Sequence, residues 1–140
     1  SGGILPARLA DVPLDFDTLQ PHGCFIGSAA VIVLSQHDSV VDAARNLMRF
    51  YKHESCGQCT PCREGCGWID RILNKLVDGH ATMEELDQLH RIASDITGNT
   101  ICAFDDGAAQ PVLSFVRKFR KQFEDYVLTG GKSQTKKLVA

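Results

Sequence analysis

The chain has 140 residues, of which 44% are hydrophobic and 23% are charged, an ordinary composition for a folded domain. Fifteen Lys and Arg against seventeen Asp and Glu leave a net charge of −2, so no basic field exists to attract a nucleic acid, and we expect no nucleic-acid partner. The longest apolar stretch, about 29–34, is too short to span a bilayer, so direct membrane insertion is not expected.

Residues 1–38 contain three prolines and then an apolar run at 27–34, Gly-Ser-Ala-Ala-Val-Ile-Val-Leu. Its short length, its β-branched residues and the turn formers around it predict one buried strand after irregular chain. A single strand cannot complete a sheet, so further strands are expected upstream. The chain also begins without Met, and we expect it to be a processed chain or a piece of a longer polypeptide.

Helical periodicity begins at Ser39, and the apolar pattern predicts four helices, over 39–52, 61–78, 82–97 and 108–128. Ser39 is expected to cap the first helix, a capping box to begin the third at Thr82, and Pro111 to lie in the first turn of the fourth. Each apolar stripe needs a partner, so a mainly α fold with a small four-helix bundle is predicted. Residues 129–140 are expected to form a flexible tail.

Two groups of side chains on these helices have simple structural interpretations. Trp68 and the phenylalanines of the last helix fall at core positions, and we expect them to be buried. The Lys and Arg residues at 117–121 are expected on a solvated face, with a docking surface for a neighbouring subunit as the alternative.

The strongest signal is segment 54–65, Glu-Ser-Cys-Gly-Gln-Cys-Thr-Pro-Cys-Arg-Glu-Gly, in which Cys56, Cys59 and Cys62 recur with two residues between neighbours. A tight loop with cysteine at every third position can wrap three corners of an iron-sulfur cubane while its backbone N–H groups face the sulfides. The spacing therefore predicts a 4Fe-4S cluster. A fourth thiolate must come from elsewhere, and Cys66 and Cys102 are the candidates.

Cys66 would complete the C-x2-C-x2-C-x3-C run of bacterial ferredoxins, but it is followed by Gly67 and not by proline. In such runs the fourth cysteine serves a second cluster, which would require about eight cysteines, and the chain has six. Cys66 also lies one helical turn beyond Cys62, whereas Cys102 ends a Gly-broken loop that can fold back. Geometry modestly favours Cys102.

Other chemistries compete with the cluster. A four-thiolate structural zinc site is the main rival, although zinc sites usually pair two C-x2-4-C knuckles. A disulfide framework and a Cys-His nucleophile fit less well, because neither a secretion context nor a third orienting group is visible. Cys24 is expected to be a small buried hydrophobe, and Arg63 either favours a reduced cluster by its charge or forms a surface ion pair.

Segment 54–65 resembles the iron-sulfur signature of the NADH-oxidising flavoprotein (F) subunit of respiratory complex I. The resemblance extends through 15–17, 27–33, 50–53, 100–103 and 107–109 and covers nearly the whole chain except the tail. It implies that Cys56, Cys59, Cys62 and Cys102 bind one 4Fe-4S cluster and that this chain holds no catalytic residue. NAD-dependent formate dehydrogenases and NAD-reducing hydrogenases use a similar diaphorase subunit, so the parent complex stays open, with complex I as the first choice.

The resemblance further implies an electron-transfer role, from FMN through the cluster to iron-sulfur clusters of partner subunits. Residues 1–38 would end a β-grasp-like domain, and 39–128 would form the helical cluster-binding domain. The 140 residues contain no Gly-rich phosphate loop, so FMN and NADH are expected only on an absent upstream domain. Expected partners are that flavin and NADH domain and the 2Fe-2S and multi-cluster subunits of the hydrophilic arm. The expected place is peripheral, on the cytoplasmic face of the bacterial inner membrane or the mitochondrial matrix side.

Overall fold

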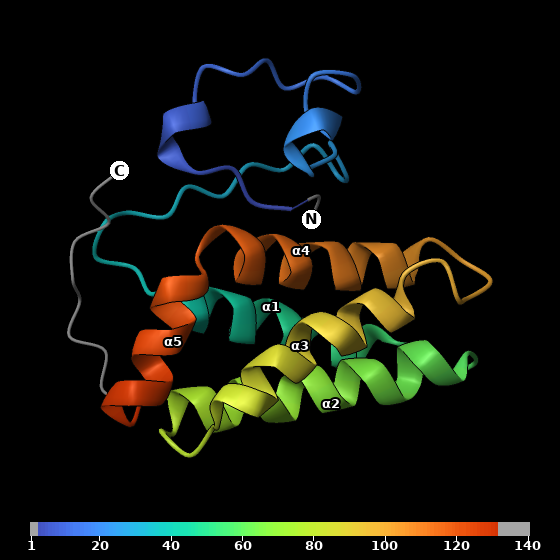
Figure 1. Cartoon of the computed structure of the whole chain (residues 1–140). Helices are drawn as coiled ribbons and strands as arrows, with labels where there is room; N and C mark the ends of the chain where they lie inside the picture. The colour runs from blue at the N-terminus through green and yellow to red at the C-terminus, as the bar shows by residue number, and fades with distance from the viewer. Residues whose placement is uncertain (1–2, 132–140) are drawn as a thin grey trace.

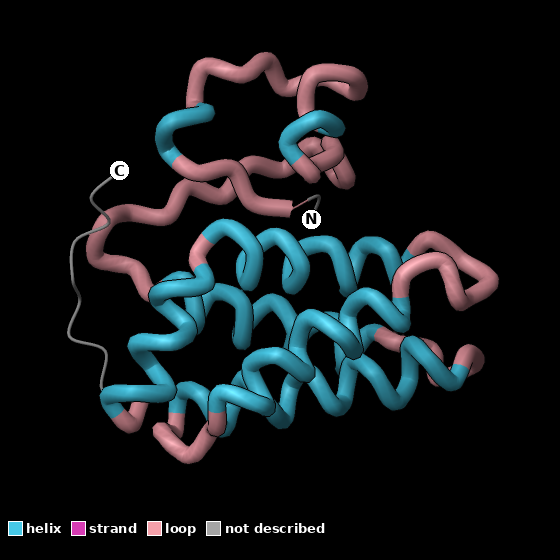
Figure 2. Tube along the Cα trace, in the orientation of Figure 1, coloured by secondary structure: helices cyan, strands magenta, loops and turns pink. Residues whose placement is uncertain are grey.

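The structure is a computed structural model that describes residues 3–131, and their regular elements are helical (Figures 1 and 2). Two single 3-10 turns, at Ala7–Leu9 and Gln20–His22, precede the α-helices. Five α-helices follow within the described residues: α1 Val40–Glu54, α2 Thr60–Val77, α3 Met83–Ile96, α4 Phe104–Lys118 and α5 Arg120–Thr129. The predicted mainly α class is confirmed.

The first four helices pack as a closed ring, in which α1 contacts α2, α2 contacts α3, α3 contacts α4, and α4 returns to α1. Short connections make sequential neighbours antiparallel, and α5 crosses one end of the ring and touches all four helices (Figure 1). The helices bury one continuous apolar core, because each carries a stripe at helical spacing. Its fully buried side chains include Met48, Ile69, Leu73, Leu76, Leu86, Leu89, Ile96 and Phe123.

The helix starts follow the local sequence closely. Ser39 caps α1 by accepting a hydrogen bond from the Asp42 N–H at 3.1 Å. Thr82 and Glu85 form the predicted capping box of α3, with bonds of 3.0 and 3.2 Å. These signals succeed because a cap satisfies backbone N–H groups that the helix itself leaves without partners.

The fourth predicted helix differs from the structure in two ways. It begins earlier, at Phe104, so Pro111 lies inside α4, where its ring is buried in the core. It is also interrupted at Phe119, whose φ of −125° is not helical, so the predicted span is divided between α4 and α5. Tertiary packing outweighs the local cost of an interior proline here.

The predicted strand at 27–34 is not formed, and no strand occurs among residues 3–131. Val31, Ile32 and Val33 are 67%, 82% and 86% exposed, and Ala29 has a left-handed φ of 59°. The physical reason is that a strand needs a neighbour for its N–H and C=O groups, and the described residues provide none. The β-grasp assignment of residues 1–38 stays a prediction.

The N-terminal segment 3–39 lies over α4 (Figure 1). The Lys118 ammonium donates hydrogen bonds to the carbonyl oxygens of Ile4 and His22, both at 2.7 Å. The Ser114 hydroxyl oxygen accepts from the Ile4 N–H at 3.0 Å. Lys118 was expected on a solvated face, and instead it joins the segment to the helices.

Two further expectations concern exposure and the chain end. The phenylalanines at 115 and 123 are buried as predicted, whereas Trp68 is 47% exposed and the prediction that it belongs to the core is wrong. Of the predicted tail 129–140, Thr129 ends α5, and 132–140 lie outside the described residues. Within the described part, no helix combines the length and apolar character that crossing a bilayer requires.

Candidate metal centre

The three closely spaced cysteines occupy the connection from α1 to α2 and the first turn of α2. α1 ends at Glu54, and Gly57 turns the connection with a φ of +78°, a conformation that glycine adopts at little cost. Cys59 is the N-cap residue of α2, and Pro61 lies in its first turn, where no N–H is needed. The local sequence therefore places the thiols of Cys59 and Cys62 at the start of α2.

The thiols differ in their exposure to solvent. Cys56 is exposed, Cys59 is half-buried, and Cys62 is only 8% exposed. The hydroxyl of Ser55 lies 3.3 Å from the Cys62 sulfur, within hydrogen-bond distance for sulfur. The segment thus runs from solvent into the edge of the core, so a group bound here would be shielded on one side.

The electrostatics of this helix start favour a negatively charged group. No side chain caps the N-terminus of α2, so its first N–H groups keep their hydrogen-bonding capacity. The helix dipole adds a partial positive charge at the same place. The Arg63 guanidinium donates to the Gly57 carbonyl oxygen at 2.9 Å and pairs with Glu64 at 2.8 Å, so it braces the loop and forms the surface ion pair that was one of its two expected roles.

Cys102 lies in the connection from α3 to α4, and its side chain is exposed. Figure 1 shows this connection at the same end of the ring as the connection from α1 to α2. Within residues 3–131, however, no three His, Cys, Asp or Glu side chains are arranged to hold a metal ion. The fold brings the four predicted ligands to one end of the molecule without gathering their sulfurs around a common point.

Cys66 lies one turn beyond Cys62 and is completely buried. Burial first, and then the nearby Cys62 and Asp105, together raise the pKa of the Cys66 thiol to about 12. Because the core encloses this thiol, it is less accessible to a bound group than the exposed thiol of Cys102. Cys24 is also buried, as predicted, with its sulfur 3.1 Å from the Lys118 ammonium.

Asp105, in the first turn of α4, is a buried residue near the site that the sequence pattern did not single out. It is 2% exposed, and its Oδ2 has no hydrogen-bond partner in the part of the chain that the structure describes. In the sequence, an acidic residue in a first helical turn looks like an ordinary helix-dipole partner. No signal in the local pattern indicates that this carboxylate turns inward.

The donor set fits an iron-sulfur cluster. Three thiols on one short segment, a helix start that favours anionic groups and a fourth thiol at the same end of the ring match what such a cluster requires of a protein. A tetrahedral zinc ion could also use four thiolates, so the geometry alone does not distinguish the two metals.

Comparison with known families decides the assignment. The family model of the NADH-ubiquinone oxidoreductase-F iron-sulfur binding region matches residues 42–126, which include all four predicted ligands. This chain belongs to that family. The matched range also covers the whole of α2, α3 and α4.

Relatives of this family have oxidoreductase names. The chain is 48% identical over 125 residues to the mitochondrial NADH dehydrogenase flavoprotein 1 of Dictyostelium discoideum, covering 89% of this chain and 26% of that protein. It is 44% identical over 124 residues to the F subunit of the NADH-quinone oxidoreductase of Rickettsia akari, covering 89% and 29%. The chain therefore spans between a quarter and a third of these relatives.

A solved structure has the same fold. A crystal structure of an NAD+-reducing NiFe hydrogenase in the air-oxidized state superposes with a TM-score of 0.80 at 30% identity, covering 90% of this chain and 22% of that one. The predicted similarity to the diaphorase subunits of hydrogenases is thus confirmed at the level of fold and family.

Proposed function

We propose that this chain is the electron-transfer domain of an NADH-oxidising F subunit, in which Cys56, Cys59, Cys62 and Cys102 hold one 4Fe-4S cluster. Its role is to relay single electrons from an FMN elsewhere in the polypeptide to iron-sulfur clusters of partner subunits. The observation that carries the proposal is the C-x2-C-x2-C segment at the start of α2, within a family match to an iron-sulfur binding region. A bound 4Fe-4S cluster supplies a one-electron carrier that makes no bond to substrate.

The chain's own residues prepare the site for such a group. Gly57 gives the loop its turn, and Arg63 holds the Gly57 carbonyl and so restrains the loop. Cys62 is only 8% exposed, at the edge of the core, where the surrounding side chains limit the access of solvent. The uncapped N–H groups of α2 favour the negative charge that thiolates bring.

The fourth ligand is proposed to be Cys102, in preference to Cys66. Cys102 stands on an exposed loop, and Gly98, with a φ of +71°, gives that loop a turn from which it can fold toward α2. Cys66 is fixed in the core, where forming a thiolate is costly. The resemblance to the F-subunit signature supports the same choice.

The remaining proposals concern the parts of the protein beyond this chain. Relatives are three to four times longer, so FMN and NADH are proposed to bind in the rest of the polypeptide. The exposed apolar segment 27–34 is proposed to pair with strands of a β-grasp-like domain there. The whole protein is proposed to be peripheral, on the cytoplasmic face of a bacterial inner membrane or the mitochondrial matrix side, and to contact 2Fe-2S and multi-cluster subunits.

A second candidate is the equivalent diaphorase domain of an NAD-reducing hydrogenase or formate dehydrogenase. The superposition on the NAD+-reducing hydrogenase favours it, at a TM-score of 0.80. Identity is higher to the two NADH dehydrogenase subunits, 48% and 44% against 30%, so we place complex I first.

Metal analysis tests the proposal. The full-length protein, purified without oxygen, is expected to contain about four iron and four sulfide for this domain, beyond any other cluster that it holds. Cys102→Ala is expected to lose that cluster, measured by iron content and by the electron paramagnetic resonance signal of the reduced protein, and Cys66→Ala to retain it. Zinc without iron would contradict the electron-transfer role, and the reverse result for the two variants would contradict the ligand assignment.

A further inference from the structure

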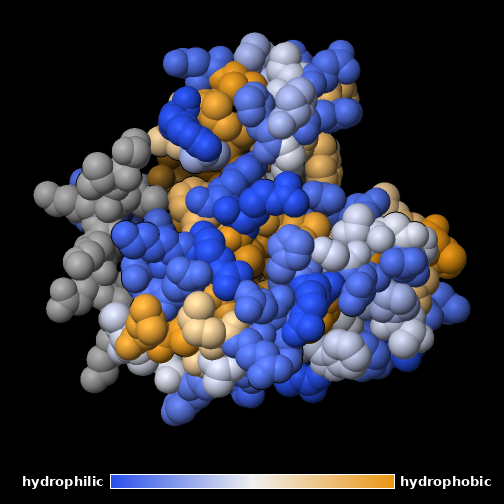
Figure 3. All heavy atoms as spheres, viewed as in Figure 1, coloured by the Kyte–Doolittle hydropathy of each residue, from blue (hydrophilic) through white to orange (hydrophobic). Residues whose placement is uncertain are grey.

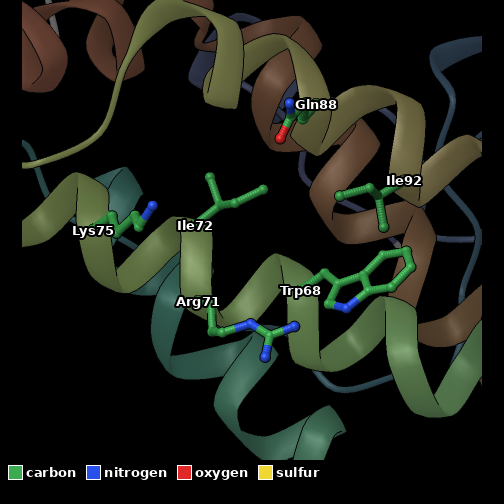
Figure 4. Close-up of a pocket in the computed structure, with 6 residues that line it drawn as sticks. All are labelled: Trp68, Arg71, Ile72, Lys75, Gln88 and Ile92. Atoms are coloured by element: carbon green, nitrogen blue, oxygen red, sulfur yellow. The ribbon is translucent and has the colours of Figure 1, made fainter.

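A surface groove lies between α2 and α3, and no cysteine lines it. It encloses about 250 Å³ and is lined by Trp68, Arg71, Ile72 and Lys75 of α2 and by Gln88 and Ile92 of α3 (Figure 4). The α2 residues share one helix face, because they are spaced three or four apart. The groove therefore belongs to two helices that are fixed by the core beneath them.

Hydrophilic and hydrophobic residues are intermixed on the face of the molecule seen in Figure 3, and the groove itself combines apolar side chains such as Trp68, Ile72 and Ile92 with polar ones (Figure 4). Trp68 is 47% exposed, whereas the next residue on α2, Ile69, is completely buried. Figure 4 shows the indole of Trp68 and the side chain of Ile92 facing one another across the two helices. A large aromatic side chain left half in water on a rigid surface is typical of the centre of a protein interface.

One rim of the groove carries an unused positive charge. The Arg71 side chain is exposed and forms no hydrogen bond or ion pair with any of residues 3–131. The other cation of the lining, Lys75, is already paired with the Glu85 carboxylate, which also accepts from the Thr82 N–H. No Asp or Glu is among the lining residues, so the groove offers a guanidinium beside an indole without a carboxylate of its own to pair with it.

We propose that this groove docks a segment of a partner subunit that carries an Asp or Glu next to an apolar side chain. The carboxylate would accept a bidentate hydrogen bond from Arg71, and the apolar side chain would cover Trp68 and Ile92. The proposal goes beyond the proposed function, and it does not depend on which metal the cysteines bind.

The position of the groove favours docking of a partner subunit rather than of another segment of this polypeptide. Within the described residues, the start of the N-terminal segment is joined to α4 through Lys118 and Ser114, so Ile4 lies on α4 and not at the groove between α2 and α3. Residues 132–140 contain three lysines and no Asp or Glu, so they offer no side-chain carboxylate for Arg71. Relatives of this chain are named as subunits of larger enzymes, so partner subunits exist for them.

The docking surface is close to the candidate metal centre. Trp68 follows Cys62 by six residues on α2, about 9 Å along the helix axis. A protein bound in the groove would therefore stand beside the cysteine-bearing end of the ring.

Charge reversal in the assembled complex tests the proposal. Arg71→Glu in the full-length protein, co-expressed with its partner subunits, is expected to weaken association at least tenfold in an affinity pull-down, whereas Arg71→Lys, which keeps the charge but not the bidentate geometry, is expected to weaken it less. Arg117→Glu is the matched control, because Arg117 is an exposed arginine on α4 that also lacks a partner among the described residues. Iron content is measured in each variant, so loss of docking is separated from loss of the metal centre. Normal association of Arg71→Glu would overturn the proposal.

Photo-crosslinking identifies the occupant. Gln88→p-benzoylphenylalanine places the probe in the groove, and the same substitution at Arg117 is the control. The expected product, by mass spectrometry, joins position 88 to a peptide of another subunit that contains Asp or Glu. A crosslink within the same polypeptide, a crosslink to a second copy of this protein, or no crosslink above the control would each overturn the proposal.

Discussion

The thiol of Cys66 is completely buried at the cysteine-bearing end of the helical ring, one turn beyond Cys62 on α2. Exposed Cys56 and Cys102 stand in contrast to it. Burial, followed by the nearby Cys62 and Asp105, raises the pKa of Cys66 from 9.0 to about 12. The neutral thiol therefore stabilises the folded state fully below pH 9, and this contribution is lost as the pH rises from 9 toward 12.

Alkylation tests this difference between thiols. In the metal-free chain at pH 8, iodoacetamide is expected to modify Cys56 and Cys102 and to leave Cys66 unmodified until the chain is unfolded, because the thiolate is the reactive form. Raising the pH to 9 should accelerate the reaction of the exposed thiols only. Mass spectrometry of the digested protein measures each site, and equal rates at Cys56 and Cys66 would show that the burial assignment is wrong.

At the scale of whole elements, α2 and α3 approach each other closely at Gly65 of α2, which has no side chain. A Cβ atom added at Gly65 would lie 2.5 Å from Ile96 Cδ1 and 2.7 Å from Ile96 Cγ1. Ile96 is 1% exposed, so its side chain has little room to move. Gly67, in the same helix, meets nothing within 4 Å, which makes the two glycines a matched pair.

Alanine at these two positions is expected to act in opposite directions. Gly65→Ala should lower the free energy of unfolding by about 1 kcal/mol, because overpacking outweighs the gain in helix propensity. Gly67→Ala should raise it by about 0.5–1 kcal/mol, because only the helix propensity changes. Urea unfolding followed by circular dichroism measures both. A stabilised Gly65→Ala would mean that Ile96 repacks freely and that the contact between α2 and α3 is looser than described.

At the scale of the whole molecule, an N-terminal segment without regular strands is attached to a helical ring by polar contacts of Lys118 and Ser114 and by Ile4 and Leu34, which pack against the core. Lys118 donates to the carbonyl oxygens of Ile4 and His22 and lies beside the Cys24 sulfur, so one ammonium joins three points of the segment to α4. The buried residues of the core all belong to the five helices, from Val40 to Tyr126. Segment and ring should therefore respond separately to loss of this contact.

Lys118→Met tests this independence. Amide hydrogen exchange is expected to become about tenfold faster or more in peptides covering 4–24, because hydrogen bonds to a charged group contribute about 1.5–3 kcal/mol. Peptides from α2 and α3 should be unchanged. Lys121→Met serves as the control, since Lys121 is exposed one turn away on α5. Faster exchange throughout the molecule would indicate that segment and ring unfold together.

Much of this protein's structure, and part of its candidate site, could be predicted from the local sequence. Ser39 and Thr82 predict their helix starts because a capping bond is formed within four residues, and the apolar stripes predict α1, α2 and α3 because burial requires that spacing. The spacing of Cys56, Cys59 and Cys62 likewise places three thiols at the start of α2 through local geometry alone. The sequence by itself therefore determined the helical class and the family resemblance that the family match confirmed, while the four ligands stay a proposal.

Only the tertiary structure decided the features that depend on distant neighbours. Pro111 lies inside α4 because packing outweighs local preference, and segment 27–34 stays exposed because the described residues contain no strand to pair with it. Trp68 has the spacing of a core residue, yet its side chain is half-exposed at the groove between α2 and α3. The reason is that helical periodicity shows which residues share a face of the helix but does not show whether another element covers that face. The local sequence also gives no sign that Asp105 turns inward or that Lys118 contacts Ile4, 114 residues away, because both features depend on residues distant in the chain.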